Sequence, residues 1–226
     1  MRVLAIGAYP DDVEFGCGAT LTKMIARGAE VTIACVTAGE QGTSSAEERP
    51  KLAATRREEA STAGRVLGVK DVRFLGLPDG LTAFSLADKV AVIRCIRDVR
   101  PDVLFVHAKA DPFPDHAVVH ALVMAAVVGA AGPWYADAGE SPHFVPRVLG
   151  FEVWHPITEP ALVVPCGDSF AVKQRALASH ASQTKTVDYV PAAEGLARYR
   201  GVMAGTGGPA EAFEVLRCSG AAFGIE

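Results

Sequence analysis

The feature that most constrains the fold is the alternation of short apolar segments with longer helix-forming segments through the first half of the chain. The apolar segments 3–8, 31–37, 72–75 and 102–108 predict strands, and segments 13–27, 51–67 and 86–99 predict helices. Gly28 and Gly68 mark the ends of the first two helices. Strands that are apolar on both faces and alternate with helices form parallel sheets covered on both sides. We therefore expect an α/β fold of the Rossmann-like type, with a mostly parallel sheet and helices on both faces.

The second half has a weaker pattern. Segments 148–154 and 161–165 predict strands, and 169–180 predicts a helix with Asp168 as its cap. The Gly-, Pro- and Ala-rich segment 132–147 carries Trp134, Tyr135 and Phe144 and is expected to form a loop that covers a substrate. No linker separates the halves. We expect one domain over 1–226, with 131–226 packing on the sheet of 1–130.

Composition excludes several classes of function. The chain has 226 residues, 50% of them hydrophobic, and a net charge of −4, so it can bury a sizeable core but offers no broad basic surface for nucleic acid or an acidic membrane. No signal peptide or membrane-spanning run is evident, which predicts a cytoplasmic location. The five scattered cysteines suggest neither disulfides nor a sulfur metal site. A small-molecule substrate is the expected partner.

Two adjacent carboxylates, Asp11 and Asp12, follow the first predicted strand in "AIGAYPDDVEFGCGATL". Aspartate is favoured at a helix start, so one of them is explained as a cap. The second indicates chemistry, because sites in parallel sheets gather at the carboxyl ends of strands.

A second polar cluster follows the fourth strand in "DPFPDHAVVHAL". Asp115 is expected to cap a helix beginning at His116, which places His116 and His120 one turn apart on a shared face. Two imidazoles facing two carboxylates make a ligand set suited to a divalent ion such as Zn²⁺. Alternatively, His120 is a core histidine bonded to a carbonyl.

The order of short motifs resembles the LmbE-like family of N-acetylglucosaminyl deacetylases, also called the PIG-L family, which are zinc hydrolases. The similar blocks run almost end to end: "AYPDDVEFGCGATL", "VTAGEQG", "RREEASTAGRVLGV", "FLGLPDG", "RPDVLFVH", "DPFPDH", "ALASHASQ", and "RYRG" followed by "AEAFEVLR". Eight blocks in order are highly specific. The resemblance implies a zinc-dependent amide hydrolase of the LmbE-like fold, acting on an amino sugar or a related conjugate, and assembling as a homo-oligomer.

In the family's first block, A-H-P-D-D, the histidine and second aspartate bind zinc and the first aspartate is the base. Those positions are Tyr9, Asp12 and Asp11. Glu14 belongs to the same block, and the resemblance places it on the substrate side of the site. The arginine of the family's R-x-x-E motif contacts the substrate. The arginine is Arg56 here.

The family's later block, H-P-D-H, binds zinc through its last histidine and uses its first to stabilise the charged intermediate. Those positions are Phe113 and His116, and His180 matches a further block. With Tyr9 and Phe113 in place of histidines, the ligand shell would be completed by Tyr9, His120 or water. The pocket also becomes more apolar, which predicts an aromatic or lipid-like group on the substrate.

Three interpretations follow from these departures. The chain is a zinc-dependent N-deacetylase with an altered substrate or rate. Alternatively, metal binding is weakened or lost, and the pocket either performs metal-free chemistry with Asp11 and Asp115 as acid and base or only binds a small molecule. In the third, one or both substitutions were introduced to trap a complex.

Overall fold

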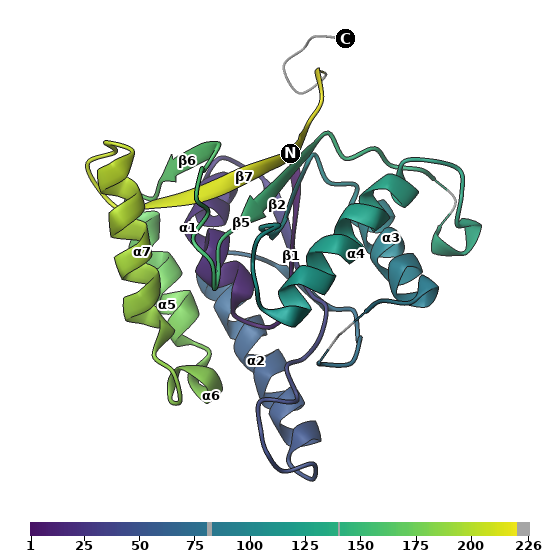
Figure 1. Ribbon diagram of the computed structural model, residues 1–226, viewed down its shortest axis with the longest axis horizontal. Coiled ribbons are helices and arrows are strands. Elements are labelled where there is room, and N and C mark those ends of the chain that lie inside the picture. The colour runs from purple at the N-terminus through teal and green to yellow at the C-terminus, as the bar shows by residue number, and fades with distance from the viewer. Residues whose placement is uncertain (81–82, 140, 221–226) are drawn as a thin grey trace.

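A single seven-stranded sheet forms the centre of the computed structural model, which describes residues 1–80, 83–139 and 141–220 (Figure 1). The strand order is β3-β2-β1-β4-β5-β7-β6. The strands are β1 (Arg2–Gly7), β2 (Glu30–Cys35), β3 (Asp71–Phe74), β4 (Val103–His107), β5 (Arg147–Phe151), β6 (Leu162–Pro165) and β7 (Ala210–Cys218). Strands β1 to β5 pair in parallel, and β7 runs antiparallel to both β5 and β6. The predicted α/β fold with a mostly parallel sheet is confirmed.

Helices cover both faces of this sheet. They are α1 (Asp12–Ala26), α2 (Arg49–Leu67), α3 (Leu86–Val99), α4 (Pro114–Ala130), α5 (Ser169–Ala178), α6 (Ala181–Thr184) and α7 (Tyr189–Met203), with a 3₁₀ turn η1 at Ala136–Ala138. Figure 1 shows α3 and α4 on one side and α1, α2, α5 and α7 on the other. Each layer has its own apolar core against the sheet. Within the described residues, no helix is long and apolar enough to span a membrane.

The predicted elements of the first half lie close to the observed ones. Helix α3 begins and ends at the predicted residues, and Gly68 ends α2 with the positive φ of 88° that glycine tolerates best. Helix α4 begins at Pro114, so the predicted cap, Asp115, lies inside its first turn and Phe113 occupies the N-cap. That prediction is wrong because proline at the first helical position, with its fixed φ, starts the helix two residues earlier.

The second half holds elements that the pattern does not predict: α6, α7 and β7. Strand β7 lies between β5 and β6, so the later strands extend the sheet of the first half. Its residues Ala210, Ala212 and Phe213 are buried.

The strand order places β1 beside β4, with β2 and β3 on one side and β5 on the other. The chain reverses its direction of winding between β1 and β4, and such a switch point is where open α/β sheets bind ligands. Both polar clusters of the sequence follow these two strands.

Candidate active site

The backbone at Asp11 explains why two aspartates follow β1. Asp11 has a φ of 109°, which is strained for a residue with a side chain, and its carboxylate makes no capping hydrogen bond to α1. Asp12 is the first residue of the helix, and its Oδ2 accepts from the Tyr9 amide at 2.7 Å. A simple helix cap therefore accounts for neither carboxylate.

Asp11 is held by an arginine from α2. Arg56 Nη2 donates to the Pro10 carbonyl at 2.8 Å and lies 3.3 Å from Asp11 Oδ2. Burial raises the pKa of Asp11; Arg56 opposes the rise and Asp12 adds to it, leaving that pKa at about 7. A carboxyl group with this proton affinity has the property expected of a general base near neutral pH.

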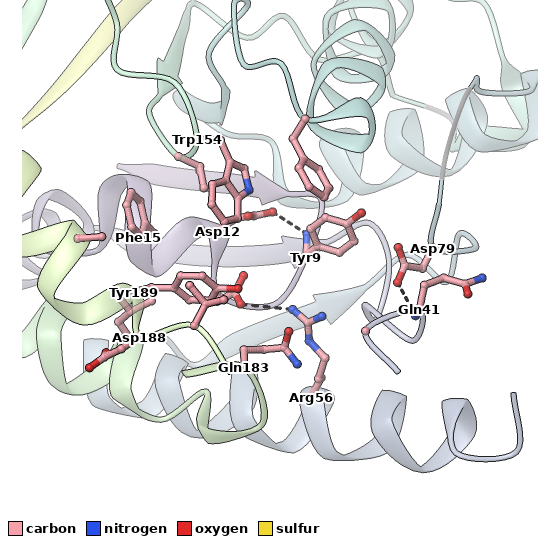
Figure 2. Close-up of a pocket in the computed structure, with 17 residues that line it drawn as sticks. Tyr9, Asp12, Phe15, Gln41, Arg56, Asp79, Trp154, Gln183, Asp188 and Tyr189 are labelled. Atoms are coloured by element: carbon pink, nitrogen blue, oxygen red, sulfur yellow. Dashed lines mark hydrogen bonds and ion pairs between the residues drawn. The ribbon is translucent and has the colours of Figure 1, made fainter. Parts of the chain in front are cut away.

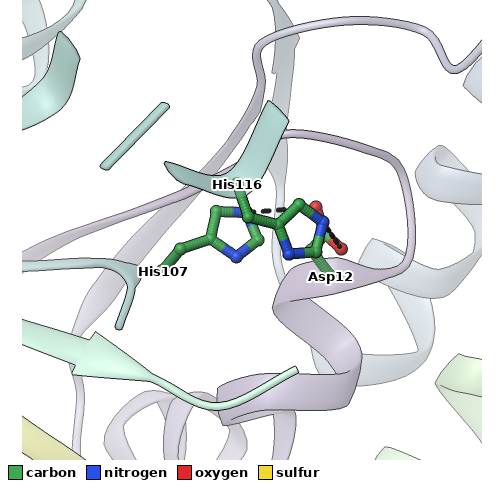
Figure 3. A group of neighbouring side chains, drawn as sticks. All are labelled: Asp12, His107 and His116. Atoms are coloured by element: carbon green, nitrogen blue, oxygen red, sulfur yellow. Dashed lines mark ion pairs between the residues drawn. The ribbon is translucent and has the colours of Figure 1, made fainter. Parts of the chain in front are cut away.

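Three buried side chains converge on one point beside this pair (Figure 3). Asp12 Oδ1 lies 3.3 Å from His116 Nε2, and Asp12 Oδ2 lies 3.2 Å from His107 Nε2. The two imidazoles stack with centroids 3.9 Å apart and both face the carboxylate. The histidines counter the effect of burial and hold the pKa of Asp12 well below its usual range. Within the part of the chain that the structure describes, this is the one group of three such side chains with metal-binding geometry.

This group fits a divalent metal ion. Both ring nitrogens of His116 and Nδ1 of His107 are buried without a hydrogen-bond partner. Two ligands about 2.1 Å from a tetrahedral Zn²⁺ are themselves roughly 3.4 Å apart, close to the separations of Asp12 from each histidine. The Ala8 amide also donates to His107 Nε2 at 2.9 Å, so His107 must give up this bond to become a ligand.

Asp111, which sequence reasoning missed, supports His116 from the other side. Its Oδ2 lies 3.2 Å from His116 Nδ1, and it accepts from the amides of Phe113 at 3.0 Å and Trp154 at 3.1 Å. Burial lowers the pKa of His116, but Asp12 and Asp111 outweigh it and raise that pKa to about 10. A carboxylate on the far nitrogen of a metal-binding histidine fixes the ring and its tautomer.

His107 was also missed as a candidate ligand. Its sequence signal is its position as the last residue of β4, at the same sheet edge as the aspartates. The predicted ligand His120 lies outside the cluster, because its Nδ1 is 2.8 Å from the His107 carbonyl oxygen. His120 is therefore a histidine bonded to a carbonyl, as the alternative interpretation expected, and it is not placed to act as a ligand in this group.

Tyr9 and Phe113 pack on His116. Ring centroids of Tyr9 and Phe113 lie 5.7 Å and 5.0 Å from that of His116, and the two rings meet edge to face. Burial, the charge of Asp79 and a hydrogen bond to Asp115 raise the pKa of the Tyr9 phenol above its ordinary value. The hydrogen bond to Asp115 engages the Tyr9 hydroxyl and competes with the ligand role predicted for it.

Asp115 lies in the first turn of α4, where it also accepts from the Gly80 amide at 2.9 Å. These contacts connect Tyr9, α4 and the segment after β3. Asp115, predicted as a catalytic residue, is buried and does not line the cavity described below.

Glu14 and His180 form a buried pair, with His180 Nε2 3.6 Å from Glu14 Oε1. Burial lowers the pKa of His180, but the charges of Glu14 and Asp11 outweigh this effect, so the net shift of that pKa is upward. Neither side chain lines the cavity described below. Both are close enough to Asp11 to affect its pKa. The substrate-binding role predicted for them is not supported, because they would not touch a ligand in that cavity.

Arg56 is engaged chiefly with the protein itself. Besides its contacts with Pro10 and Asp11, its Nη1 donates to the Gly39 carbonyl at 3.1 Å. Gly39 has a φ of 68°, and a Cβ there would lie 2.0 Å from Arg56 Nη1. Arg56 thus fixes the loops after β1 and β2 while one side of it lines the cavity.

A cavity of about 390 Å³ opens beside these groups (Figure 2). Asp11, Asp12, Tyr9 and Arg56 form one part of its lining. The rest is contributed by Phe15, Gln41, Gly42, Asp79, Phe113, Val153, Trp154, Leu177, Gln183, Val187, Asp188, Tyr189 and Ala192. The cavity therefore joins a polar end to a largely apolar wall.

The predicted cover over residues 132–147 does not reach this cavity. Arg97 of α3 binds the segment through the carbonyls of Gly132, Trp134, Tyr135 and Gly139. Among the described residues of the segment, none lines the cavity. The expectation was wrong because an arginine buried in α3 holds this loop against another part of the protein.

Comparison with known proteins gives a consistent family. Residues 4–127 match the model of the family described as PIG-L: GlcNAc-PI de-N-acetylase. The chain is 31% identical over 190 residues to the diacetylchitobiose deacetylase of Thermococcus kodakarensis, covering 80% of this chain and 70% of that protein. It is 35% identical over 162 residues to the 1D-myo-inositol 2-acetamido-2-deoxy-alpha-D-glucopyranoside deacetylase of Geodermatophilus obscurus, covering 59% of this chain and 55% of that protein.

A solved structure shares the fold over nearly the whole chain. The N,N'-diacetylchitobiose deacetylase from Pyrococcus horikoshii, complexed with its inhibitor, superposes with a TM-score of 0.85 at 26% identity. The match covers 95% of this chain and 83% of that one.

Proposed function

Because the chain belongs to the PIG-L family of de-N-acetylases, we propose that it is a zinc-dependent N-deacetylase that hydrolyses an amide of an amino sugar or a related small-molecule conjugate. The observation that carries the proposal is the buried group of Asp12, His107 and His116 next to the strained Asp11. Three protein ligands beside a cavity are the arrangement of a catalytic metal site.

The metal would be held by Asp12, His116 and His107. His107 would be the third ligand, a role that the family gives to the histidine that is replaced by Tyr9 in this sequence. A bound Zn²⁺ supplies a Lewis acid that lowers the pKa of a water and polarises a carbonyl. Asp111 keeps Nε2 of His116 directed at the site through its contact with Nδ1.

Asp11 takes the proton from the attacking water and passes it to the leaving amine. Its strained backbone and the contact with Arg56 fix the carboxylate in place, so no reorganisation is needed as the proton moves. The rings of Phe113 and Tyr9 pack against His116.

Phe113 supplies no hydrogen-bond donor where the family's histidine stabilises the tetrahedral intermediate. Loss of one such donor lowers the rate by about 10²- to 10³-fold. We therefore expect slow turnover unless the substrate carries a compensating group.

The test is the metal content of untagged protein, measured by elemental mass spectrometry after dialysis in trace zinc, together with turnover of N-acetylglucosamine conjugates before and after a chelator. About one zinc per chain and chelator-sensitive hydrolysis support the proposal. A metal-free protein with chelator-resistant turnover indicates metal-free chemistry. A metal-free protein without turnover indicates a binding function.

We place the protein in the cytoplasm as a homo-oligomer that takes a small molecule and does not bind nucleic acid. The five cysteines are free, four of them buried, which suits a reducing compartment. Size-exclusion chromatography with light scattering tests the assembly.

A further inference from the structure

The cavity has a wall of aromatic side chains, and the proposed chemistry gives no role to two of them, Trp154 and Tyr189. Phe113 and Trp154 lie nearly parallel, with centroids 5.9 Å apart, and Tyr189 meets Trp154 edge to face. Figure 2 shows Trp154 and Tyr189 among the side chains that line the cavity with Asp12 and Arg56. Phe15, Leu177 and Val187 continue the apolar lining.

Two of these rings are only partly covered by the protein. Phe113 is 38% and Trp154 50% exposed, although both line a cavity that contains the catalytic aspartates. Their main chain is held in place, since both backbone amides donate to Asp111. A half-exposed aromatic surface beside a reaction centre is buried further when it covers a flat or apolar group of a ligand.

Apart from a bound metal ion, the lining offers little to hold a negatively charged group of a ligand. Four carboxylates line the cavity, those of Asp11, Asp12, Asp79 and Asp188, against one guanidinium, that of Arg56. The Nη donors of Arg56 are bonded to Gly39, Pro10 and Asp11, and its Nε is buried. Arg56 therefore has no free fork to offer a carboxylate or phosphate, as bidentate recognition requires.

We propose that the substrate is a neutral or cationic amide that carries an aromatic or alkyl group close to the amide, and that Phe113, Trp154 and Tyr189 bind this group. Phosphorylated and carboxylated conjugates are disfavoured, because the one guanidinium of the lining is engaged by the protein and offers them no free fork. The proposal rests on the proposed N-deacetylase function, whose substrate class it specifies.

Four probes test the proposal with the zinc-loaded full chain: the methyl and phenyl β-glycosides of N-acetylglucosamine, N-benzoylglucosamine, and N-acetylglucosamine 6-phosphate. We expect at least one phenyl compound to have a KM roughly tenfold below that of the methyl glycoside, and the phosphate to bind more weakly than the methyl glycoside. Trp154→Ala should remove the phenyl preference. Trp134→Ala, which changes a tryptophan that is 60% exposed and outside the cavity, should preserve it.

Equal KM values for the methyl and phenyl compounds, or tighter binding of the phosphate, would overturn the proposal. Calorimetric binding of the same four probes keeps it testable if none is hydrolysed. Absent turnover with a retained phenyl preference contradicts the deacetylase function alone, whereas turnover without that preference contradicts the substrate class alone.

Discussion

The two sides of the cavity differ in how the chain builds them. The proposed catalytic side, Asp11, Asp12, His107 and His116, lies at or after the carboxyl ends of β1 and β4, two neighbouring parallel strands, so its side chains are positioned by the sheet. The aromatic side takes Trp154 from the segment after β5 and Tyr189 from the start of α7. The comparison suggests that the reaction chemistry is fixed by the fold, while recognition is set by connections that vary more freely.

The strongest test of the catalytic side is His116→Ala. Removing the proposed ligand, which contacts both Asp12 and Asp111, leaves two buried carboxylates without their shared partner, so bound zinc should fall from about one per chain to near zero and turnover should be lost. Elemental mass spectrometry and an amide-hydrolysis assay give the two readouts.

The matched control is His155→Ala, which removes an exposed histidine. It should retain zinc and activity. Full zinc occupancy in His116→Ala would show that the metal binds elsewhere, and would contradict a metal site at Asp12, His107 and His116.

Asp11→Asn should keep the metal but lower kcat by about 10²- to 10⁴-fold, because an amide cannot accept the proton. Asparagine tolerates positive φ better than alanine does, so the strained backbone is preserved. Kinetics and metal content are measured on the same sample. Asp168→Asn, at another helix N-cap without a capping hydrogen bond, is the control, and an equal loss in both variants would contradict the role of Asp11.

The contrast between the two sides also explains what sequence could predict. Strand ends at Asp11, Asp12 and His107 follow from apolar periodicity, and the resemblance adds roles for Asp12 and His116. The choice of His107 over His120 depends on which face of α4 meets β4, and their spacing alone does not reveal that. A helical i, i+4 pattern brings two side chains to one face without saying what that face contacts.

The aromatic wall shows the other limit. Trp134, Tyr135 and Phe144 lie in the segment that looks most like a cover, yet the cavity is lined by Trp154 and Tyr189. The distinguishing interaction, Arg97 with the carbonyls of 132–139, joins residues distant in sequence. Such long-range contacts leave no periodic signal in one sequence.

Asp111 links the two sides, and Asp111→Asn should weaken both. One of its oxygens contacts His116 and the Trp154 amide, so losing an acceptor loosens a ligand and the aromatic wall together. We expect zinc affinity to fall by about 10- to 100-fold, measured by competition with a chromogenic chelator. Asp98→Asn, at an exposed ion pair with Arg73, should leave the affinity unchanged. An unchanged zinc affinity in Asp111→Asn would show that Asp111 does not support the ligand His116, and would contradict its role as a link between the two sides.

The smallest expected effect tests whether Arg56 belongs to the catalytic side or only to the scaffold. Gly39→Ala places a Cβ 2.0 Å from Arg56 Nη1, so the guanidinium must move and its hold on Asp11 loosens. Gly76→Ala is the matched control, because Gly76 has a similar φ of 76° but open space around a Cβ. Both variants should lose about 1–2 kcal/mol of stability in denaturant unfolding, since alanine is strained at positive φ. Only Gly39→Ala should also lose kcat, by several-fold, with KM little changed. If kcat falls equally in both, the strain alone is responsible, and Arg56 is part of the scaffold.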